Sequence, residues 1–347
     1  MSENGSRRVV EFDIDRYVRN SKKVDLTQID WEDIPNHPLS DGDVMCLHYM
    51  MDIETHTVIY LRDLLATRVS HDPHVTAFLS CWVYEELWHG EAFSDFLRQY
   101  GLEVPAEPRL PDGSRPLPSR PARTARLREQ MGVGHQLFVL PSMLGSLLMR
   151  DFVALHMTWG AINELTTLTA YYQLIRRSDH PVLHQMLRKV IQDERRHFAF
   201  YRAQAKARLT GNARASRMVR WALKAFWSPV GAGVKTEEEV DALALYLFAD
   251  APEGRQAVRD VDRMVSELPG LQGLTLLEDV LDRAIERARR KPGWAGTGPG
   301  LVYGAQHDGA RPNGGSGAPP PTHWRPADAP REDALAVQPG EPANDPV

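Results

Sequence analysis

Two copies of a Glu-x-x-His motif constrain the fold of this chain more than any other feature. The first copy runs from Glu86 to His89, and the second runs from Glu194 to His197. Residues three apart on an α-helix lie on the same face, so each copy brings a carboxylate and an imidazole together. One copy arises easily by chance on a solvated helix face, and the significance of this pair therefore depends on what surrounds each copy.

Each copy follows a long amphipathic segment with a glutamate in its apolar stripe. Glu54 precedes the first copy and Glu164 precedes the second. The number of residues from Glu54 to the first motif is almost the same as the number from Glu164 to the second. A glutamate that faces a core is costly unless it is paired or bound to a metal. The alternative for Glu54 is a place at the edge of the stripe, where its carboxylate reaches water. The pattern predicts two helix hairpins of matching size.

Apolar residues recur at helical spacing in four long segments. Helix-start signals lie at Ser40-Asp41, Asp72-Pro73 and His180-Pro181, and a stop signal lies at Gly101. These signals predict helices over 41–65, 73–100, 150–177 and 181–210.

The same patterns divide the chain into four parts. Residues 1–40 form an N-terminal extension with a short helix at 13–19 and with Trp31, Ile34 and Pro35 packed as a lid. Residues 41–210 form the bundle, which includes a Pro-rich connector at 102–122 and one or two helices at 123–148, with Pro141 as a candidate break. Residues 211–290 form accessory helices at about 213–227, 236–250, 253–267 and 272–290. Residues 291–347 form a disordered tail rich in Pro and Gly.

Bulk properties exclude several classes of protein. An apolar content of 42% suffices for a core, and a net charge of −5 gives no general attraction to nucleic acid or to an anionic membrane. Cys46 and Cys81 are the only cysteines, too few for a disulfide framework, so a reducing cytosol is expected. The polar N-terminus predicts no signal peptide, and no apolar run is long enough for a membrane span. No P-loop, dinucleotide-binding glycine motif or HExxH motif occurs.

The combined set matches the pattern by which a four-helix bundle holds two metal ions, with one Glu from each of two helices and Glu-x-x-His from the other two. The predicted ligands are Glu54, Glu86, His89, Glu164, Glu194 and His197. Two iron ions about 3.5–4 Å apart need bridging carboxylates, and four glutamates balance the charge of two ferrous ions. Glu86 and Glu194 are candidates for the bridging role, but the sequence leaves this open. Imidazole suits iron, and one His per ion leaves positions for dioxygen.

Neighbours of the ligands receive separate predictions. A metal-binding His donates its second N–H to an acceptor, and Asp193 is a candidate for that role or else a solvated helix residue. Thr167 lies three residues after Glu164, so its hydroxyl faces the metal region or bonds back to its own helix. Glu85 is predicted to point away from the ligand face. An ordinary core histidine is the alternative for His89.

Several of these residues together resemble a known family. Glu85-Glu86-x-x-His89-Gly90 and Asp193-Glu194-x-Arg196-His197 are similar to the E-E-x-x-H-G and D-E-x-R-H motifs of soluble acyl-ACP desaturases of the stearoyl-ACP desaturase type. The Glu164-x-x-Thr167 spacing resembles that family's third-helix glutamate and its threonine near the oxygen site. The resemblance covers about residues 25–225. It implies an all-α, ferritin-like four-helix bundle with two Fe ions per chain, extended here by the C-terminal helices and the tail.

The resemblance also implies an activity. It indicates an O2-dependent diiron oxidase of fatty acid biosynthesis, which introduces a cis double bond into a saturated acyl chain carried on acyl carrier protein. It further implies a ferredoxin-type electron donor, a cytosolic homodimer, and catalytic roles for Thr167 and Asp193. Two features depart from the family: the span between the two motif pairs is longer, and the tail is not typical.

Two other functions remain as alternatives. One is a diiron N-oxygenase or hydroxylase of a biosynthetic pathway. Arylamine N-oxygenases carry an additional histidine one turn before the last glutamate, where this chain has Val190, which disfavours them. The other is a non-catalytic ferritin-like iron-binding protein, although such chains are usually shorter and lack the connector and the accessory helices.

A basic stretch at 188–224 suggests a partner surface. It is rich in Lys and Arg, and its only acids are Asp193 and Glu194. Acyl carrier proteins are strongly acidic, and complementary charge raises the association rate and fixes the docking register. The sequence therefore predicts a docking surface around Arg202, Lys206 and Arg208. The alternative is a solvated basic face balanced by acids from other segments.

Overall fold

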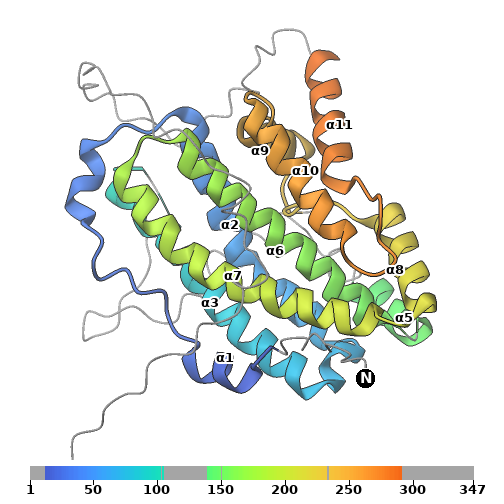
Figure 1. Cartoon of the computed structure of the whole chain (residues 1–347). Helices are drawn as coiled ribbons and strands as arrows, with labels where there is room; N and C mark the ends of the chain where they lie inside the picture. The colour runs from blue at the N-terminus through green and yellow to red at the C-terminus, as the bar shows by residue number, and fades with distance from the viewer. Residues whose placement is uncertain (1–11, 103, 105–138, 150, 233, 291–347) are drawn as a thin grey trace, which may run out of the picture.

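A computed structural model describes residues 12–102, 104, 139–149, 151–232 and 234–290 of the chain (Figure 1). The secondary structure of these residues is helical, without a β-strand. The predicted all-α helical bundle is confirmed. Most of the predicted connector, the segment 123–138 and the predicted tail at 291–347 lie outside the described residues.

Four long helices form the bundle, and their bounds closely match the predicted ones. They are α2 (Asp41–Leu65), α3 (Pro73–Gln99), α6 (Phe152–Arg177) and α7 (Pro181–Leu209). Helix α2 packs along α3, and α6 packs along α7, as the two predicted hairpins (Figure 1). Local chemistry sets the helix starts. Ser40 and Asp43 form a reciprocal capping box at α2, and the Asp72 side chain accepts two backbone N–H groups at α3.

Two glycines allow the paired helices to approach each other closely. A Cβ atom at Gly90 of α3 would lie 2.6 Å from the Thr55 hydroxyl of α2. A Cβ atom at Gly160 of α6 would lie 2.3 Å from the Tyr201 ring of α7. Gly90 follows His89 directly and Gly160 lies about one turn before Glu164, so both close approaches lie near the predicted ligands.

The N-terminal extension packs on the bundle through α1 (Ile14–Asn20) and the 3-10 helix η1 (Trp31–Asn36). Helix α1 contacts α3, and η1 contacts both α3 and α7. Tyr17 is buried, Ile34 is fully buried, and Trp31 packs against the core from a partly exposed position. Trp31 and Ile34 therefore pack on the bundle as predicted, whereas Pro35 is exposed and that part of the lid prediction is wrong.

The remaining helices flank the bundle. The 3-10 helix η2 (Arg68–His71) links α2 to α3, and α5 (Val139–Leu148) precedes the third bundle helix. Helix α5 as described begins at Val139, two residues before Pro141, and the residues that precede it lie outside the described part of the chain. The predicted break at Pro141 therefore stays a prediction.

The accessory helices occur as predicted. They are α8 (Ala213–Phe226), α9 (Glu237–Phe248), α10 (Pro252–Ser266) and α11 (Leu276–Arg290). Helices α8, α9 and α10 contact α6, and α9 also contacts α2, so this group covers one side of the bundle (Figure 1). Cys46 and Cys81 are free thiols. None of the helices in the described part of the chain is both long and apolar enough to cross a membrane.

We expect Gly160→Ala to destabilise the protein. The new methyl would overlap the Tyr201 ring, which is fully buried against Phe78 and Trp82 and cannot move aside. Overpacking costs about 1–3 kcal/mol, against about 1 kcal/mol gained in helix propensity. Calorimetry should show a lower melting temperature. In a double variant with Tyr201→Leu, the loss should be smaller than the sum of the single changes. A raised melting temperature for Gly160→Ala would contradict the close approach.

Candidate metal centre

The six predicted ligands meet inside the bundle in one cluster drawn from all four helices. Helix α2 contributes Glu54 and α6 contributes Glu164, while α3 and α7 each contribute the Glu and His of one motif. All six side chains are buried, and the most exposed of them, Glu164, is 6% exposed. Their ligand atoms form two groups in which the atoms lie within 4.8 Å of one another, and each group could hold a metal ion.

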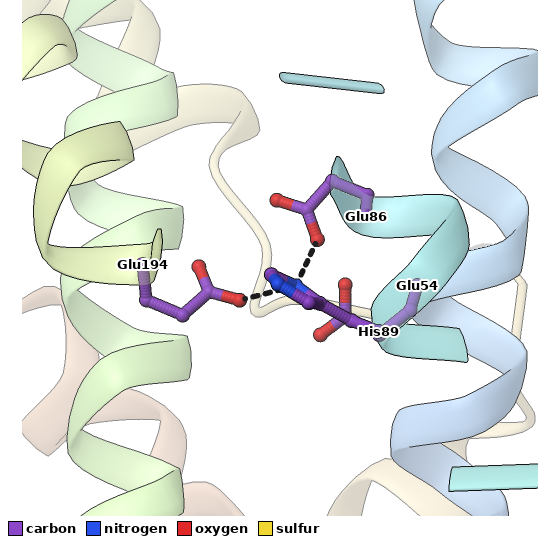
Figure 2. Close-up of side chains that lie close together, drawn as sticks. All are labelled: Glu54, Glu86, His89 and Glu194. Carbon is purple, nitrogen blue, oxygen red and sulfur yellow. Dashed lines mark ion pairs between the residues drawn. The ribbon is translucent and has the colours of Figure 1, made fainter. Parts of the chain in front are cut away.

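The two groups share Glu86 and Glu194, and each adds one further glutamate and one histidine. The groups are Glu54, Glu86, His89 and Glu194 (Figure 2), and Glu86, Glu164, Glu194 and His197.

The shared carboxylates face both histidines. His89 Nδ1 lies 3.4 Å from Glu86 Oε2 and 3.2 Å from Glu194 Oε1. His197 Nδ1 lies 3.0 Å from Glu86 Oε1 and 3.4 Å from Glu194 Oε2. Each shared glutamate thus turns one oxygen toward each histidine, which is the arrangement that bridging carboxylates need. If each group held an ion, Glu86 and Glu194 would be the two carboxylates common to both groups.

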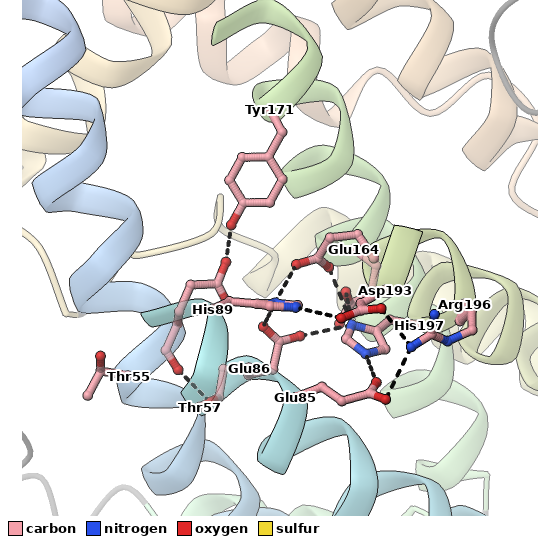
Figure 3. Close-up of polar contacts among 12 residues, drawn as sticks. Thr55, Thr57, Glu85, Glu86, His89, Glu164, Tyr171, Asp193, Arg196 and His197 are labelled. Carbon is pink, nitrogen blue, oxygen red and sulfur yellow. Dashed lines mark hydrogen bonds and ion pairs between the residues drawn. The ribbon is translucent and has the colours of Figure 1, made fainter. Parts of the chain in front are cut away.

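Each histidine turns its other ring nitrogen toward an additional acid. His89 Nε2 lies 3.2 Å from Asp193 Oδ2, and His197 Nε2 lies 2.7 Å from Glu85 Oε2. Each acid and the histidine that it contacts lie on different helices. Asp193 of α7 contacts His89 of α3, and Glu85 of α3 contacts His197 of α7 (Figure 3). Asp193 therefore has a contact of the predicted kind. Such contacts set the tautomer and orientation of a metal-binding imidazole.

Glu85 does not point away from the ligand region, so that prediction is wrong. Its carboxylate is fully buried and accepts hydrogen bonds from His197, from the Tyr17 hydroxyl at 2.9 Å and from Arg196 at 3.2 Å. Arg196 also lies 2.7 Å from Asp193, so it links the two supporting acids (Figure 3). An acid directly precedes each Glu-x-x-His motif, and this repeat was the sequence signal that could have identified Glu85.

Burial and neighbouring charges set the protonation of the cluster. Burial raises the pKa of Glu54 and Glu164 well above the usual value, and the nearby shared carboxylates add to the rise. Burial alone would lower the pKa of His89 and His197, but their contacts with several acids raise it well above the usual value. A metal ion that binds here displaces these protons.

The donor set fits a metal ion. His89 Nδ1 and Glu194 Oε1 are buried and face each other at 3.2 Å, but neither atom makes a hydrogen bond with the residues that the structure describes. Buried polar atoms are nearly always hydrogen-bonded, and a metal ion is a partner that would satisfy both atoms. Carboxylate oxygens and imidazole nitrogens that converge from four rigid helices are suitable ligands for such a partner.

An apolar cavity of about 60 Å³ begins beside the cluster. Glu54 and Thr167 line it at the bundle, and Phe248, Val258 and Leu277 line it where α9, α10 and α11 cover the bundle. Thr167 thus lines the same cavity as the predicted ligand Glu54. Its catalytic role remains a prediction.

Acids from other segments neutralise part of the basic stretch at 188–224. Arg202 lies 2.9 Å from Glu267, and Arg208 lies 2.6 Å from Asp72. For these two residues the structure favours a balanced face over a docking surface. Two other members of the stretch, on α8, are exposed and have no ion-pair partner within the described ranges. They are Arg217 and Lys224.

Comparison of the chain with protein-family models, curated proteins and solved structures found no match.

Proposed function

We propose that the protein is an O2-dependent diiron oxidase and that it acts as an acyl-ACP desaturase. The observation that carries the proposal is the pair of buried ligand groups that share Glu86 and Glu194. Glu54 and His89 would complete one iron site, and Glu164 and His197 would complete the other. When bound, the two irons would supply the O2 chemistry that removes hydrogen from an unactivated hydrocarbon.

The chain's own side chains prepare this site. Asp193 and Glu85 hold the two imidazoles with Nδ1 turned toward the shared carboxylates. Arg196 balances the charge of both acids. Tyr171 donates a hydrogen bond to Glu54 and so orients that carboxylate. Burial of the whole set excludes water, which protects reactive oxygen chemistry from side reactions.

The cavity supports an apolar substrate. Beyond Glu54 and the two threonines of α6, its walls are mainly aliphatic and aromatic side chains. A saturated acyl chain has no polar group that such walls would leave unpaired. At about 60 Å³ the cavity is smaller than the roughly 300–1,000 Å³ of typical ligand sites. An acyl chain would therefore enter by displacing side chains such as Leu277 and Phe248 of the accessory helices.

Hydroxylation of an apolar chain is the second candidate, because the same centre and cavity would serve it. An N-oxygenase is disfavoured, since Val190 is fully buried at the position of the additional histidine. A purely iron-binding protein has no need of an apolar cavity next to the metal centre.

Mass spectrometry of the product tests the proposal. The iron-loaded protein, a one-electron donor system and O2 are incubated with long-chain acyl-ACP. A mass loss of two indicates desaturation, whereas a gain of sixteen indicates hydroxylation. An unchanged substrate, with iron bound and electrons supplied, would contradict both oxidase functions for this substrate class.

The proposed carrier-protein surface is the outer face of α8. Arg217 and Lys224 are exposed there, and the segment after α8 contributes Pro229 and Val230 to the cavity wall. A carrier docked on this face would present its acyl chain close to the cavity. A ferredoxin-type electron donor, a homodimeric state and a cytoplasmic location belong to the same proposal.

Charge reversal on α8 is expected to weaken docking. Arg217→Glu combined with Lys224→Glu should raise the apparent KM for acyl-ACP severalfold, because complementary charge is lost, while iron content and kcat stay unchanged. The effect should shrink with added salt, since exposed charges are screened within a Debye length of about 8–10 Å. Arg202→Gln is the matched control, because Glu267 already neutralises Arg202. An unchanged KM in the double variant would remove α8 as the docking surface.

A further inference from the structure

A second layer of polar side chains lies in the bundle core next to the metal centre. Each bundle helix contributes one aromatic residue: Tyr60 from α2, Trp82 from α3, His156 from α6 and Tyr201 from α7. Each lies about one to two helical turns from a predicted ligand on its own helix.

The order of residues places this layer on the side of the metal centre opposite the cavity. On α2 the cavity-lining residues precede Glu54, whereas Tyr60 follows it. On α6 the cavity-lining residues follow Glu164, whereas His156 precedes it. The metal centre therefore lies between an apolar cavity and a layer of oxidisable or basic rings.

The four rings form a closed circle of contacts. The Tyr60 ring centroid lies 6.1 Å from Trp82 and 5.6 Å from His156. The Tyr201 ring centroid lies 6.1 Å from Trp82 and 6.3 Å from His156. Each of the four rings therefore contacts two others of the layer.

Packing alone does not explain why these residues are polar. Trp82 Nε1, His156 Nε2 and the Tyr201 hydroxyl are buried without a hydrogen-bond partner among the described residues. Aliphatic side chains would fill a bundle core without that penalty. The Tyr60 hydroxyl lies 3.3 Å from His156 Nδ1, and this phenol–imidazole hydrogen bond is the polar link within the layer.

We propose that Tyr60 and His156 form a proton-coupled redox pair beside the metal centre. In the oxidising step Tyr60 gives one electron to a one-electron oxidant, its O–H bond breaks, and the proton passes to His156 Nδ1. The products are a neutral tyrosyl radical and an imidazolium. A one-electron donor reverses the step and returns the proton to the phenol oxygen. This inference rests on the proposed function for its natural oxidant, the O2-oxidised metal centre, and for its reductant, a ferredoxin-type protein.

The surroundings of the pair suit this step. Burial lowers the pKa of His156 to about 3, so the imidazole is neutral at physiological pH but a weak base. It can still accept the proton of Tyr60, because loss of an electron makes the phenol O–H strongly acidic. Tyr60 is only partly buried, whereas Tyr201 and Trp82 are buried. Tyr60 therefore lies between the buried centre and the surface, where a protein donor makes contact.

Other tyrosines near the centre have less suitable proton acceptors. Tyr171 donates to Glu54, a predicted ligand, and Tyr17 donates to Glu85, which supports His197. Oxidation of either phenol would pass a proton to a carboxylate that is itself a predicted metal ligand or that contacts a metal-binding histidine. Oxidation of Tyr60 passes its proton to a base outside the ligand set.

Photo-oxidation of the zinc-loaded, full-length protein tests the pair without redox-active metal. Flash-generated ruthenium(III) tris-bipyridine serves as the oxidant, and electron paramagnetic resonance of frozen samples detects tyrosyl radicals. We expect a component that is absent in Tyr60→Phe and severalfold weaker in His156→Phe. Tyr201→Phe is the matched control, because it removes a hydroxyl from the same layer, and the component should remain. The other tyrosines contribute an equal background to every sample.

A radical spectrum of the same shape and intensity in wild type and Tyr60→Phe would overturn the proposal. So would a component that disappears in Tyr171→Phe but persists in Tyr60→Phe. Melting curves of the zinc-loaded variants check the fold. If His156→Phe does not fold, His156→Asn replaces it, and an undiminished Tyr60 component in that variant would overturn the role of His156.

The iron-loaded protein separates this inference from the proposed function. Freeze-quenching after addition of O2 to the ferrous protein should give the same Tyr60-dependent signal. If photo-oxidation gives the signal and O2 does not, the redox pair stands but the metal centre is not its oxidant, and the product mass of acyl-ACP tests the oxidase function separately.

Discussion

Anaerobic reconstitution with ferrous iron is expected to load two irons per chain, and His197→Ala is expected to lose at least one of them. His197 supplies the imidazole of its ligand group, and its Nδ1 lies within 3.0–3.4 Å of both shared carboxylates. Its removal leaves one ion a ligand short and leaves the buried Glu85 without its histidine partner. Elemental analysis after desalting measures the iron bound per chain.

His184→Ala is the matched control for this experiment. His184 lies on the same helix, but its Nε2 lies 2.6 Å from the Ser178 carbonyl oxygen rather than at the cluster. This variant should keep two irons. A reconstituted wild-type protein that holds one metal ion or none would contradict the diiron centre.

Glu85→Gln is expected to weaken iron binding about 10–100-fold, although Glu85 is not a predicted ligand. The substitution keeps the size of the side chain but removes the negative charge that faces His197 Nε2 at 2.7 Å. It also leaves Arg196 with one acid instead of two. Titration against a chelator of known affinity measures the change, and an affinity equal to that of wild type would contradict a supporting role.

The crossed supports predict which ion each acid affects. Glu85→Gln should weaken the ion held by His197, whereas Asp193→Asn should weaken the ion held by His89. Added to His197→Ala, Glu85→Gln should change little, because both act on one ion. Added to His89→Ala, it should still weaken iron binding, because the two substitutions act on different ions. The reverse pattern would show that each acid supports the histidine of its own helix.

Spacing within single helices was sufficient to predict the helices and the ligand set. The three-residue step from Glu86 to His89, and the place of Glu54 in an apolar stripe, depend only on helix geometry. The cap at Ser40 is equally local, because its partner Asp43 lies in the same turn. Such patterns can be read without knowing which helices are neighbours.

Predictions failed or stayed open where a contact joins segments far apart in the sequence. Glu85 lies beside the ligand face of its own helix, and only the approach of α7 brings His197 and Arg196 to its carboxylate. Arg202 is neutralised by Glu267, from a segment that the basic stretch does not contain. The sequence also did not predict that residues of the accessory helices line the cavity.

The sequence by itself determined the four bundle helices, their pairing into hairpins and the identity of the six candidate ligands, because each follows from periodicity, capping and spacing along one helix. Tertiary structure alone decided that Glu86 and Glu194 face both histidines, that the supporting acids cross between helices, and that Tyr60 meets His156. Each of these depends on the rotation and register of one helix against another. That arrangement is set by side-chain packing over the whole interface rather than by any local pattern.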